Sequence, residues 1–389
     1  MAIQIRSNHY VIKTDHFYSP EPIEGTVYIE VNNSRIEQVS FEPPTSNIEL
    51  VDLTNFVVGP GFIDVHIHGF AGHDTMEGTL EAISSMAEKL ASTGTTAFLP
   101  TTTGAPVETL KPIMDLSNSF AQIKGAKPLG LHLEGPFISK KVPGAMDPNL
   151  FRQANKDDIM ELLSEGKALM VTMAPEIEGH LDMIELFAGY GVSVSLGHTS
   201  TDYETAAKAF AKGATSITHY FNAMSPFQHR QPGLIGAGLL YPFYLQFIAD
   251  GVHTHIATIK IMCQYVKDRL VLITDATMAA GLGKPGTYTL GNRKIIVDET
   301  SARLENGTLA GSVLTMDRGF RNLICVGGLS VSEAFTCASL LPAKSIGLTD
   351  RGTVKKGAMA DIVVLHTETL QVEATIREGN LIYARADQQ

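Results

Sequence analysis

Phe62-Ile63-Asp64-Val65-His66-Ile67-His68 is a short, largely apolar run that ends in two histidines two residues apart. A run of this length and character is typical of a buried strand. Seven more such runs follow at intervals of roughly 25 to 40 residues, the repeat of a strand, a helix and their loops. The eight runs are 62–67, 96–101, 129–133, 168–173, 192–196, 216–218, 245–249 and 270–274.

Helical periodicity fills several of the intervals between these runs. One apolar face is made by Leu80, Ile83, Met86, Ala87 and Leu90. The Ala-rich stretch 202–212 follows the cap-like residues 199–201 and ends before a glycine at 213, so we expect another helix there. Eight strand–helix units predict an α/β fold, a (β/α)₈ TIM-type barrel. An open doubly wound sheet is the alternative, but no Gly-x-Gly-x-x-Gly follows the first strand.

Both ends of the chain read as β-structure instead. Residues 26–31 are β-branched and aromatic, 361–365 and 370–376 predict two strands, and a turn at 378–380 precedes 381–383. We therefore expect a small β-sandwich domain built from residues 1–56 and 356–389. The barrel domain is expected over residues 57–355.

Composition narrows the function classes. The net charge is −11, with 44% hydrophobic and 18% charged residues, which describes a globular protein without the basic face of a nucleic-acid binder. No stretch reaches the ~18 continuous apolar residues of a membrane span, and the N-terminus lacks the pattern of a secretory signal. Cys263, Cys325 and Cys337 are too few and too widely spaced for a disulfide scaffold. We expect a cytoplasmic protein.

Residues that bind metals or move protons follow almost every predicted strand. In a barrel these positions converge at the C-terminal mouth, where barrel enzymes carry out their chemistry. A single histidine after a strand is most often structural. Here six of the eight predicted strands are followed by such residues, which indicates a site. They are His66 and His68 after run one, His132 and Glu134 after run three, His198 after run five, His219 after run six, Asp250 and His253 after run seven, and Asp275 after run eight.

The spacing of these residues favours a metal centre. Residues two apart in a strand point to the same side, so His66 and His68 can both face the barrel interior. With a further imidazole and a carboxylate they suit Zn²⁺ or Fe²⁺. The alternative is a hydrogen-bonded strand pair without metal. Glu134 is preferred over His132 as a ligand because it leads directly into the Gly135-Pro136 loop.

Two other polar residues suit roles beside the metal. A carboxylate at the end of a buried strand, such as Asp275, is costly unless it is paired, and beside an activated water it can accept and return a proton. A structural Asp capping a loop is the alternative. Arg230 is the one Lys or Arg in the long loop 222–233, where it suits an anion clamp, although an exposed loop arginine is often simply solvated.

The chain resembles the amidohydrolase superfamily and, within it, the amino-sugar-phosphate deacetylases. Pro60 to Gly69 is similar to the superfamily's first-strand signature, and Gly357 to Val363 to its closing motif. The narrower resemblance rests on motifs that run the length of the chain in the family's order. These motifs are HLEGPF at 132–137, LGHT at 196–199, THYFNAM at 218–224, ADGVH at 249–253, TDA at 274–276 and LAGS at 309–312.

This resemblance implies an activity and a set of roles. The activity is hydrolysis of N-acetylglucosamine 6-phosphate to glucosamine 6-phosphate and acetate, by a homodimer with one or two Zn²⁺ or Fe²⁺ ions per subunit. It implies that Glu134, His198 and His219 hold the tighter metal, that His66 and His68 complete a second site in binuclear members, and that Asp275 is the acid/base. It also implies that Asn222, Ala223 and Arg230 bind the phosphate, that His253 contacts it from across the dimer interface, and that Ala145, Leu309, Ala310 and Gly311 line the sugar pocket.

The loop near Ala145 departs from the family pattern. Where the family commonly has a histidine or glutamine to contact the substrate amide, this chain has Met146. A thioether cannot donate a hydrogen bond to an oxyanion. Either the metal alone stabilises the oxyanion, or another residue such as His255 or Asp147 assists. A further alternative is a substrate with a different acyl group or sugar.

Three alternative functions remain open. N-acetylgalactosamine 6-phosphate differs from the implied substrate in one hydroxyl orientation. A cyclic-amide or dipeptide amidohydrolase would commonly have a carboxylated lysine after strand four, where this chain reads Met173-Ala174-Pro175-Glu176. A catalytically silent scaffold would not need the complete ligand set.

Overall fold

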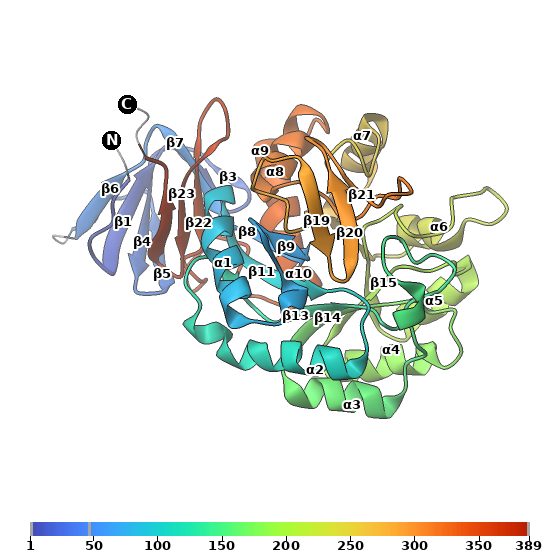
Figure 1. Ribbon diagram of the computed structural model, residues 1–389. Coiled ribbons are helices and arrows are strands. Elements are labelled where there is room, and N and C mark those ends of the chain that lie inside the picture. The colour runs from blue at the N-terminus through green and yellow to red at the C-terminus, as the bar shows by residue number, and fades with distance from the viewer. Residues whose placement is uncertain (1–2, 46–47, 387–389) are drawn as a thin grey trace.

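A nearly closed barrel of eight parallel strands, surrounded by helices, forms the centre of the computed structural model, which describes residues 3–45 and 48–386 (Figure 1). Each barrel strand overlaps one of the eight predicted runs, so the predicted (β/α)₈ fold is confirmed. The barrel strands are β8 (Phe62–Ile67), β11 (Thr95–Thr102), β13 (Leu131–Glu134), β14 (Ala168–Met173), β15 (Ser193–Leu196), β16 (Ala214–Ile217), β17 (Tyr244–Phe247) and β18 (Leu270–Leu272). Each pairs in parallel with the next.

Helices pack on the outside of the barrel with their apolar faces inward. In α1 the predicted face is largely buried, with Ile83, Met86 and Ala87 inaccessible to solvent. The α-helices are α1 (Leu80–Leu90), α2 (Val107–Asp115), α3 (Lys156–Glu165), α4 (His180–Gly189), α5 (Tyr203–Ala211), α6 (Gly233–Leu240), α7 (Ile256–Tyr265), α8 (Met316–Cys325), α9 (Val331–Phe335) and α10 (Leu341–Ser345). Shorter helical segments are η1 (Thr75–Glu77), η2 (Ala91–Thr93), η3 (Leu116–Gln122), η4 (Pro148–Leu150), η5 (Lys267–Arg269) and η6 (Thr336–Leu340), and three two-residue strands are β9 (Gly69–Phe70), β10 (His73–Asp74) and β12 (Lys127–Pro128).

The start of α5 corrects one detail of the sequence analysis. The helix is capped by Asp202, whose side chain accepts from the backbone N–H of Thr205 at 2.7 Å, and not by residues 199–201. Thr199 and Ser200 instead hydrogen-bond to Glu176 after β14, with the Ser200 N–H 2.8 Å from Oε1. They therefore fasten the turn that follows His198.

Strands from the two ends of the chain lie side by side, as expected (Figure 1). One sheet has the order β5-β4-β1-β6 and the other β24-β23-β22-β7-β2-β3, with β22 antiparallel to β7. These strands are β1 (His9–Thr14), β2 (His16–Tyr18), β3 (Pro22–Ile23), β4 (Val27–Asn32), β5 (Arg35–Ser40), β6 (Glu49–Asp52), β7 (Phe56–Pro60), β22 (Ile362–His366), β23 (Val372–Arg377) and β24 (Asn380–Ala384). The four terminal strands predicted from sequence are thereby confirmed. The domain division at 56/57 and 355/356 stays a proposal, and residues 1–2, 46–47 and 387–389 within it lie outside the described residues.

A three-stranded antiparallel sheet between β18 and α8 was not predicted. Its strands are β19 (Gly286–Leu290), β20 (Arg293–Val297) and β21 (Ala302–Arg303), and β19 and β20 form a hairpin. The turn Gly291-Asn292 and the apolar run before Val297 are hairpin signals that sequence reasoning could have used. The hairpin matters because it carries Leu290 to the mouth of the barrel.

A buried carboxylate helps to close the barrel between its last and first strands. Asp64 on β8 is inaccessible to solvent, and its Oδ2 accepts from the Thr274 hydroxyl at 2.5 Å. Its Oδ1 accepts from the backbone N–H groups of His66 and Thr274 at 3.2 and 3.3 Å. Burial raises the pKa of Asp64 to about 6, although these hydrogen bonds oppose the shift. The backbone N–H of Asp275 donates to the His66 carbonyl at 2.9 Å. This bond brings two predicted site residues together.

Two further observations concern the state of the cysteines and the length of the helices. All three cysteines are free thiols, of which Cys263 and Cys337 are buried and Cys325 is exposed. Within residues 3–45 and 48–386, no helix has the length and apolar character needed to cross a bilayer.

Replacing Thr274 tests the closure of the barrel. Thr274→Val removes the hydroxyl that donates to Asp64, so we expect the free energy of unfolding of the metal-free protein to fall by about 1–3 kcal/mol. Chemical denaturation measures this loss. Ser216→Ala on neighbouring β16 is the control, because the buried Ser216 hydroxyl has no partner among the described residues. A Thr274→Val protein as stable as its parent would contradict this role.

Candidate metal centre and pocket

The five predicted metal ligands lie together at the C-terminal mouth of the barrel. They come from the ends of four barrel strands, and none is more than 4% exposed. Their donor atoms form two groups that share Glu134, namely His66/His68/Glu134 and Glu134/His198/His219. The period-two alternation of β8 and β13 turns His66, His68 and Glu134 inward.

The Glu134/His198/His219 group is the tighter one. Nε2 of His198 and Nε2 of His219 lie 3.2 and 3.0 Å from Glu134 Oε1, and 3.0 Å from each other. Hydrogen bonds alone satisfy these three atoms poorly. When two ring nitrogens face each other, at most one of them can donate a hydrogen bond to the other. A cation shared by all three donors satisfies them, and the N/O donor set suits Zn²⁺ or Fe²⁺.

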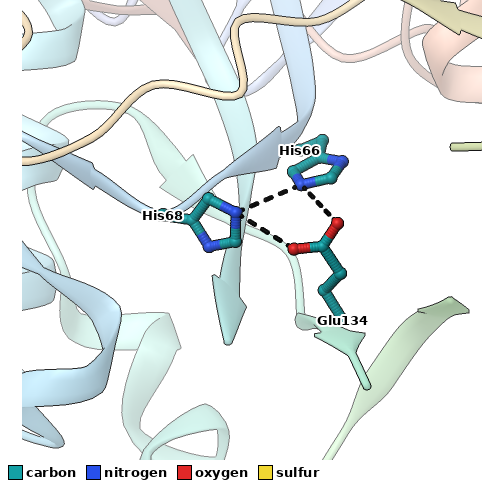
Figure 2. A group of neighbouring side chains, drawn as sticks. All are labelled: His66, His68 and Glu134. Carbon is teal, nitrogen blue, oxygen red and sulfur yellow. Dashed lines mark hydrogen bonds and ion pairs between the residues drawn. The ribbon is translucent and has the colours of Figure 1, made fainter. Parts of the chain in front are cut away.

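The His66/His68/Glu134 group reaches both oxygens of the same carboxylate (Figure 2). His68 Nε2 lies 3.2 Å from Glu134 Oε2, and His66 Nε2 lies 3.5 Å from Glu134 Oε1. The two imidazoles approach within 3.4 Å. Asp275 Oδ1 is 3.2 Å from His68 Nε2 and 3.5 Å from His66 Nε2, so a second carboxylate faces this group.

Charge in the metal-free pocket follows from this crowding. Burial alone would raise the pKa of Glu134, but His66 and the hydrogen bonds of His198 and His219 outweigh it and hold that pKa well below its ordinary value. Burial opposes the charged form of His68 as well, yet Asp275 and Glu134 raise its pKa well above the ordinary value. Protons thus supply, without metal, the positive charge that a bound cation would supply.

Backbone carbonyls orient three of the imidazoles. A proton on Nδ1 donates outward, which leaves the Nε2 lone pair directed at the centre. The three bonds are His68 Nδ1 to Thr101 O at 3.2 Å, His198 Nδ1 to Val142 O at 3.1 Å, and His219 Nδ1 to Asn222 O at 3.1 Å.

Several of these side chains stand on a strained backbone. His198, His219 and Asp275 have φ values of 48°, 29° and 49°, in the left-handed region that residues with a Cβ rarely adopt. Such conformations cost on the order of 1–3 kcal/mol each and collect at functional sites. Here the strain occurs where three barrel strands end and their next residue must turn toward the centre.

Asp275 has the environment expected of a proton acceptor. It is 7% exposed and lines the pocket, so it reaches the space above the metal ligands. Burial would raise its pKa, but His66 and His68 lower it below the ordinary value, which keeps the carboxylate ionised at neutral pH.

A cavity of about 170 Å³ opens over Asp275 and the metal ligands. Most of the predicted substrate residues line it, but Arg230 and Ala310 do not. Ala310 is buried behind the wall, and Arg230 is exposed on a tight turn between Gln228 and Gln231. The predicted residues in the lining are His68, Glu134, Ala145, His198, His219, Asn222, Ala223, His253, Asp275, Leu309 and Gly311. His66 lies deeper, below the lining.

His253 lines the pocket of its own chain, so contact across an interface is not needed to bring it there. Its Nδ1 is 2.7 Å from Asp250 Oδ2, and Asp250 Oδ1 accepts from the backbone N–H groups of Val252 and His253 at 2.8 Å. Asp250 thereby holds the imidazole in one orientation, with Nε2 left for a ligand.

Met146 lines the pocket, and its sulfur is engaged by a backbone group. Its Sδ accepts from the backbone N–H of Gly104 at 3.2 Å. The two residues considered as substitutes are used elsewhere: His255 caps α7, and Asp147 caps η4. Neither lines the cavity, so both alternatives are wrong for this chain.

His132 is structural, in keeping with the preference for Glu134. Its Nδ1 bonds the Val65 carbonyl at 3.1 Å, and its Nε2 meets the Thr172 hydroxyl at 2.8 Å. Burial lowers its pKa well below the ordinary value, so it is neutral. Glu176, in the loop after β14, accepts a hydrogen bond from the turn after His198. It belongs to neither group of metal donors found in the described chain.

Sequence reasoning missed four residues of the pocket wall, Thr103, Gly144, Leu290 and Thr308. Thr103 follows β11, the one early barrel strand whose end carries no titratable residue, so no signal marked it. Leu290 and Thr308 come from the unpredicted hairpin and the loop after it. Recognition of the Gly291-Asn292 turn could have found Leu290.

Comparison with protein-family models places residues 57–382 in a match to the amidohydrolase family. The chain is 35% identical, over 84% of its length and 83% of the relative, to N-acetylglucosamine-6-phosphate deacetylase of Vibrio furnissii. It is 36% identical, over 83% and 86% of the two chains, to N-acetylgalactosamine-6-phosphate deacetylase of Escherichia coli O157:H7.

A solved structure agrees over nearly the whole chain. It is a mutant N-acetyl-D-glucosamine-6-phosphate deacetylase from Mycobacterium smegmatis in complex with N-acetyl-D-glucosamine-6-phosphate, 32% identical to this chain. The TM-score is 0.91, with 97% of this chain and 100% of the other covered.

Substitution of the shared ligand tests the two-group arrangement. Glu134→Gln replaces the carboxylate common to both groups with a neutral amide, so we expect the purified protein to lose tightly bound divalent metal at both. His198→Asn affects one group only and should keep metal at the other. Elemental analysis against protein concentration measures the ratio.

Glu165→Gln, a change on the exterior helix α3, is the matched control and should bind metal like the parent. A Glu134→Gln protein with the parent's metal content would contradict the assignment.

Proposed function

The chain belongs to the amidohydrolase family, and from this premise we propose that it hydrolyses N-acetylglucosamine 6-phosphate to glucosamine 6-phosphate and acetate. The observation that carries the proposal is the buried double histidine–glutamate centre, with the Asp275 carboxylate 3.2 Å from one of its imidazoles. Full-length relatives with deacetylase activity on amino-sugar phosphates supply the substrate class.

The metal is proposed to be Zn²⁺ or Fe²⁺. Glu134, His198 and His219 hold the tighter position, and His66 and His68 complete a second one with Glu134. When bound, a divalent cation supplies an acidified water and positive charge beside the acetyl carbonyl.

Asp275 moves the protons of the reaction. Its ionised carboxylate accepts a proton from the attacking water as the carbon–oxygen bond forms. It then delivers that proton to the departing nitrogen as the carbon–nitrogen bond breaks, which releases acetate and the free amine. Gly311 and Leu309 shape the wall beside it, with Ala310 supporting them from behind.

The phosphate is proposed to lie near Asn222, Ala223 and His253. Ala223 has a φ of 49°, so the loop after β16 turns sharply beside the pocket and can present its amide groups to an anion. His253 offers Nε2 because Asp250 occupies its Nδ1. No Lys or Arg lines the described cavity, so a dianionic phosphate lacks a permanent cationic partner within one chain.

We infer a homodimer from this missing cation and from an apolar surface. Leu240 at the end of α6 is 76% exposed, and Tyr265 and Ile261 on α7 are 72% and 55% exposed. Phe227, in the loop that carries Arg230, is 53% exposed. In this proposal the second copy supplies the missing cation, and Arg230 in the exposed loop before α6 is the candidate to pair with the phosphate. Light scattering on the parent and on Tyr265→Asp, which should shift toward monomer, checks this.

The cytoplasm is the proposed compartment. Three free thiols, one of them exposed, suit a reducing environment.

The gluco and galacto epimers are the main alternatives for the substrate. Relatives of near-equal identity act on each of the two, at 35% and 36%. We keep the gluco sugar because the solved structure at a TM-score of 0.91 holds it. The ratio of kcat/KM for the two sugars decides, and a higher value for the galacto sugar would overturn the choice.

Replacing Asp275 tests the mechanism. Asp275→Asn keeps the shape of the side chain but cannot accept a proton, so we expect kcat to fall by at least about 10²–10⁴-fold. Acetate release measures kcat, and elemental analysis of the same sample should show unchanged metal. Near-normal kcat in Asp275→Asn would sink the assignment.

A further inference from the structure

His66 is oriented differently from the other three imidazoles of the centre. Their outer nitrogens bond backbone carbonyls, which no substitution removes. The Nδ1 of His66 instead lies 3.0 Å from the side-chain oxygen of Gln246. Among the described residues, this is the one imidazole of the centre whose outer partner is a side chain.

Gln246 is positioned from inside the barrel. It lies on β17, is 1% exposed, and has its amide nitrogen 3.0 Å from the sulfur of Met170 on β14. A thioether only accepts hydrogen bonds, so the NH₂ group faces Met170 and the oxygen faces His66. A proton of His66 is therefore held on Nδ1, and Nε2 faces Glu134.

The apolar surroundings make Gln246 a costly residue for packing alone. The apolar residues inside the barrel include Met170, Ile248 and Val271, all at most 1% exposed. A buried amide is unfavourable when its hydrogen bonds are poor, and sulfur is a weak acceptor. Leu or Met would fill the same space without that cost, so the oxygen contact to His66 is the feature that distinguishes Gln246.

We propose that Gln246 is a positioning residue that keeps the His66/His68 metal position open to a cation. Without its oxygen, the proton of His66 can move to Nε2 and donate to Glu134 Oε1, which lies 3.5 Å away. The pair then forms a hydrogen bond in place of a metal site. The Glu134/His198/His219 position keeps its own backbone partners and does not depend on Gln246.

This inference rests on the proposed function, because it specifies how many metals that centre holds. Gln246 touches neither substrate nor the reacting atoms in this account, so its effect is on metal occupancy. Removing a hydrogen-bond partner of a ligating imidazole typically weakens metal binding ~10–100-fold.

Metal titration of full-length variants tests the proposal without any sugar. The chain is stripped with a chelator and titrated with Zn²⁺ in competition with a chromophoric chelator. We expect two Zn²⁺ per chain in the parent. Gln246→Met, close in shape but without the amide oxygen, should weaken one of the two sites ~10–100-fold and leave the other unchanged.

Two further variants separate positioning from packing. Gln246→Glu restores an acceptor for Nδ1–H and should recover both sites. Ser216→Ala, a buried change on neighbouring β16, should bind like the parent. Thermal unfolding of the metal-free forms shows whether Gln246→Met folds normally.

The outcomes distinguish the proposal from its rivals. The proposal is overturned if the parent binds a single Zn²⁺, if Gln246→Met keeps both affinities, if it weakens both sites equally, or if Gln246→Glu fails to recover the second site. The proposed function can fail independently, because a chain that binds Zn²⁺ as expected and releases no acetate would refute the deacetylase assignment alone.

Discussion

The carboxylate of Glu134, surrounded by four imidazoles and almost shielded from water, is the constraint on which the rest of the site depends. An isolated buried charge is strongly unfavourable, so this group must be paired with positive charge at all times. Protons on the imidazoles do so in the metal-free chain, and a divalent cation does so in the working enzyme. The same requirement explains why all four ring nitrogens point to one place.

The barrel is built to meet this requirement. Asp64 and Thr274 connect the first and last strands immediately beneath His66 and Asp275, so the two walls of the centre cannot separate. Left-handed backbone at the strand ends directs His198, His219 and Asp275 inward at a local energetic cost. Backbone carbonyls orient three imidazoles, and the side chain of Gln246 orients the fourth.

The metal side of the site was predictable from sequence, and the substrate side only partly. Strand periodicity decides which way His66, His68 and Glu134 point, and a parallel barrel brings all strand ends to one mouth. Strand periodicity does not determine where a loop residue lies. Arg230 was therefore expected in the pocket but lies outside the pocket of its own chain. Leu290 was missed because its hairpin was not predicted. Gln246 lies in no recognisable motif, because its role depends on His66, a partner 180 residues away.

Acetate release from N-acetylglucosamine 6-phosphate, before and after metal removal, tests the central claim most directly. The account predicts that chelation abolishes release while the chain stays folded, and that adding back Zn²⁺ or Fe²⁺ restores it in proportion to the metal bound. Undiminished release from metal-free protein, or no release from metal-loaded protein, would contradict it.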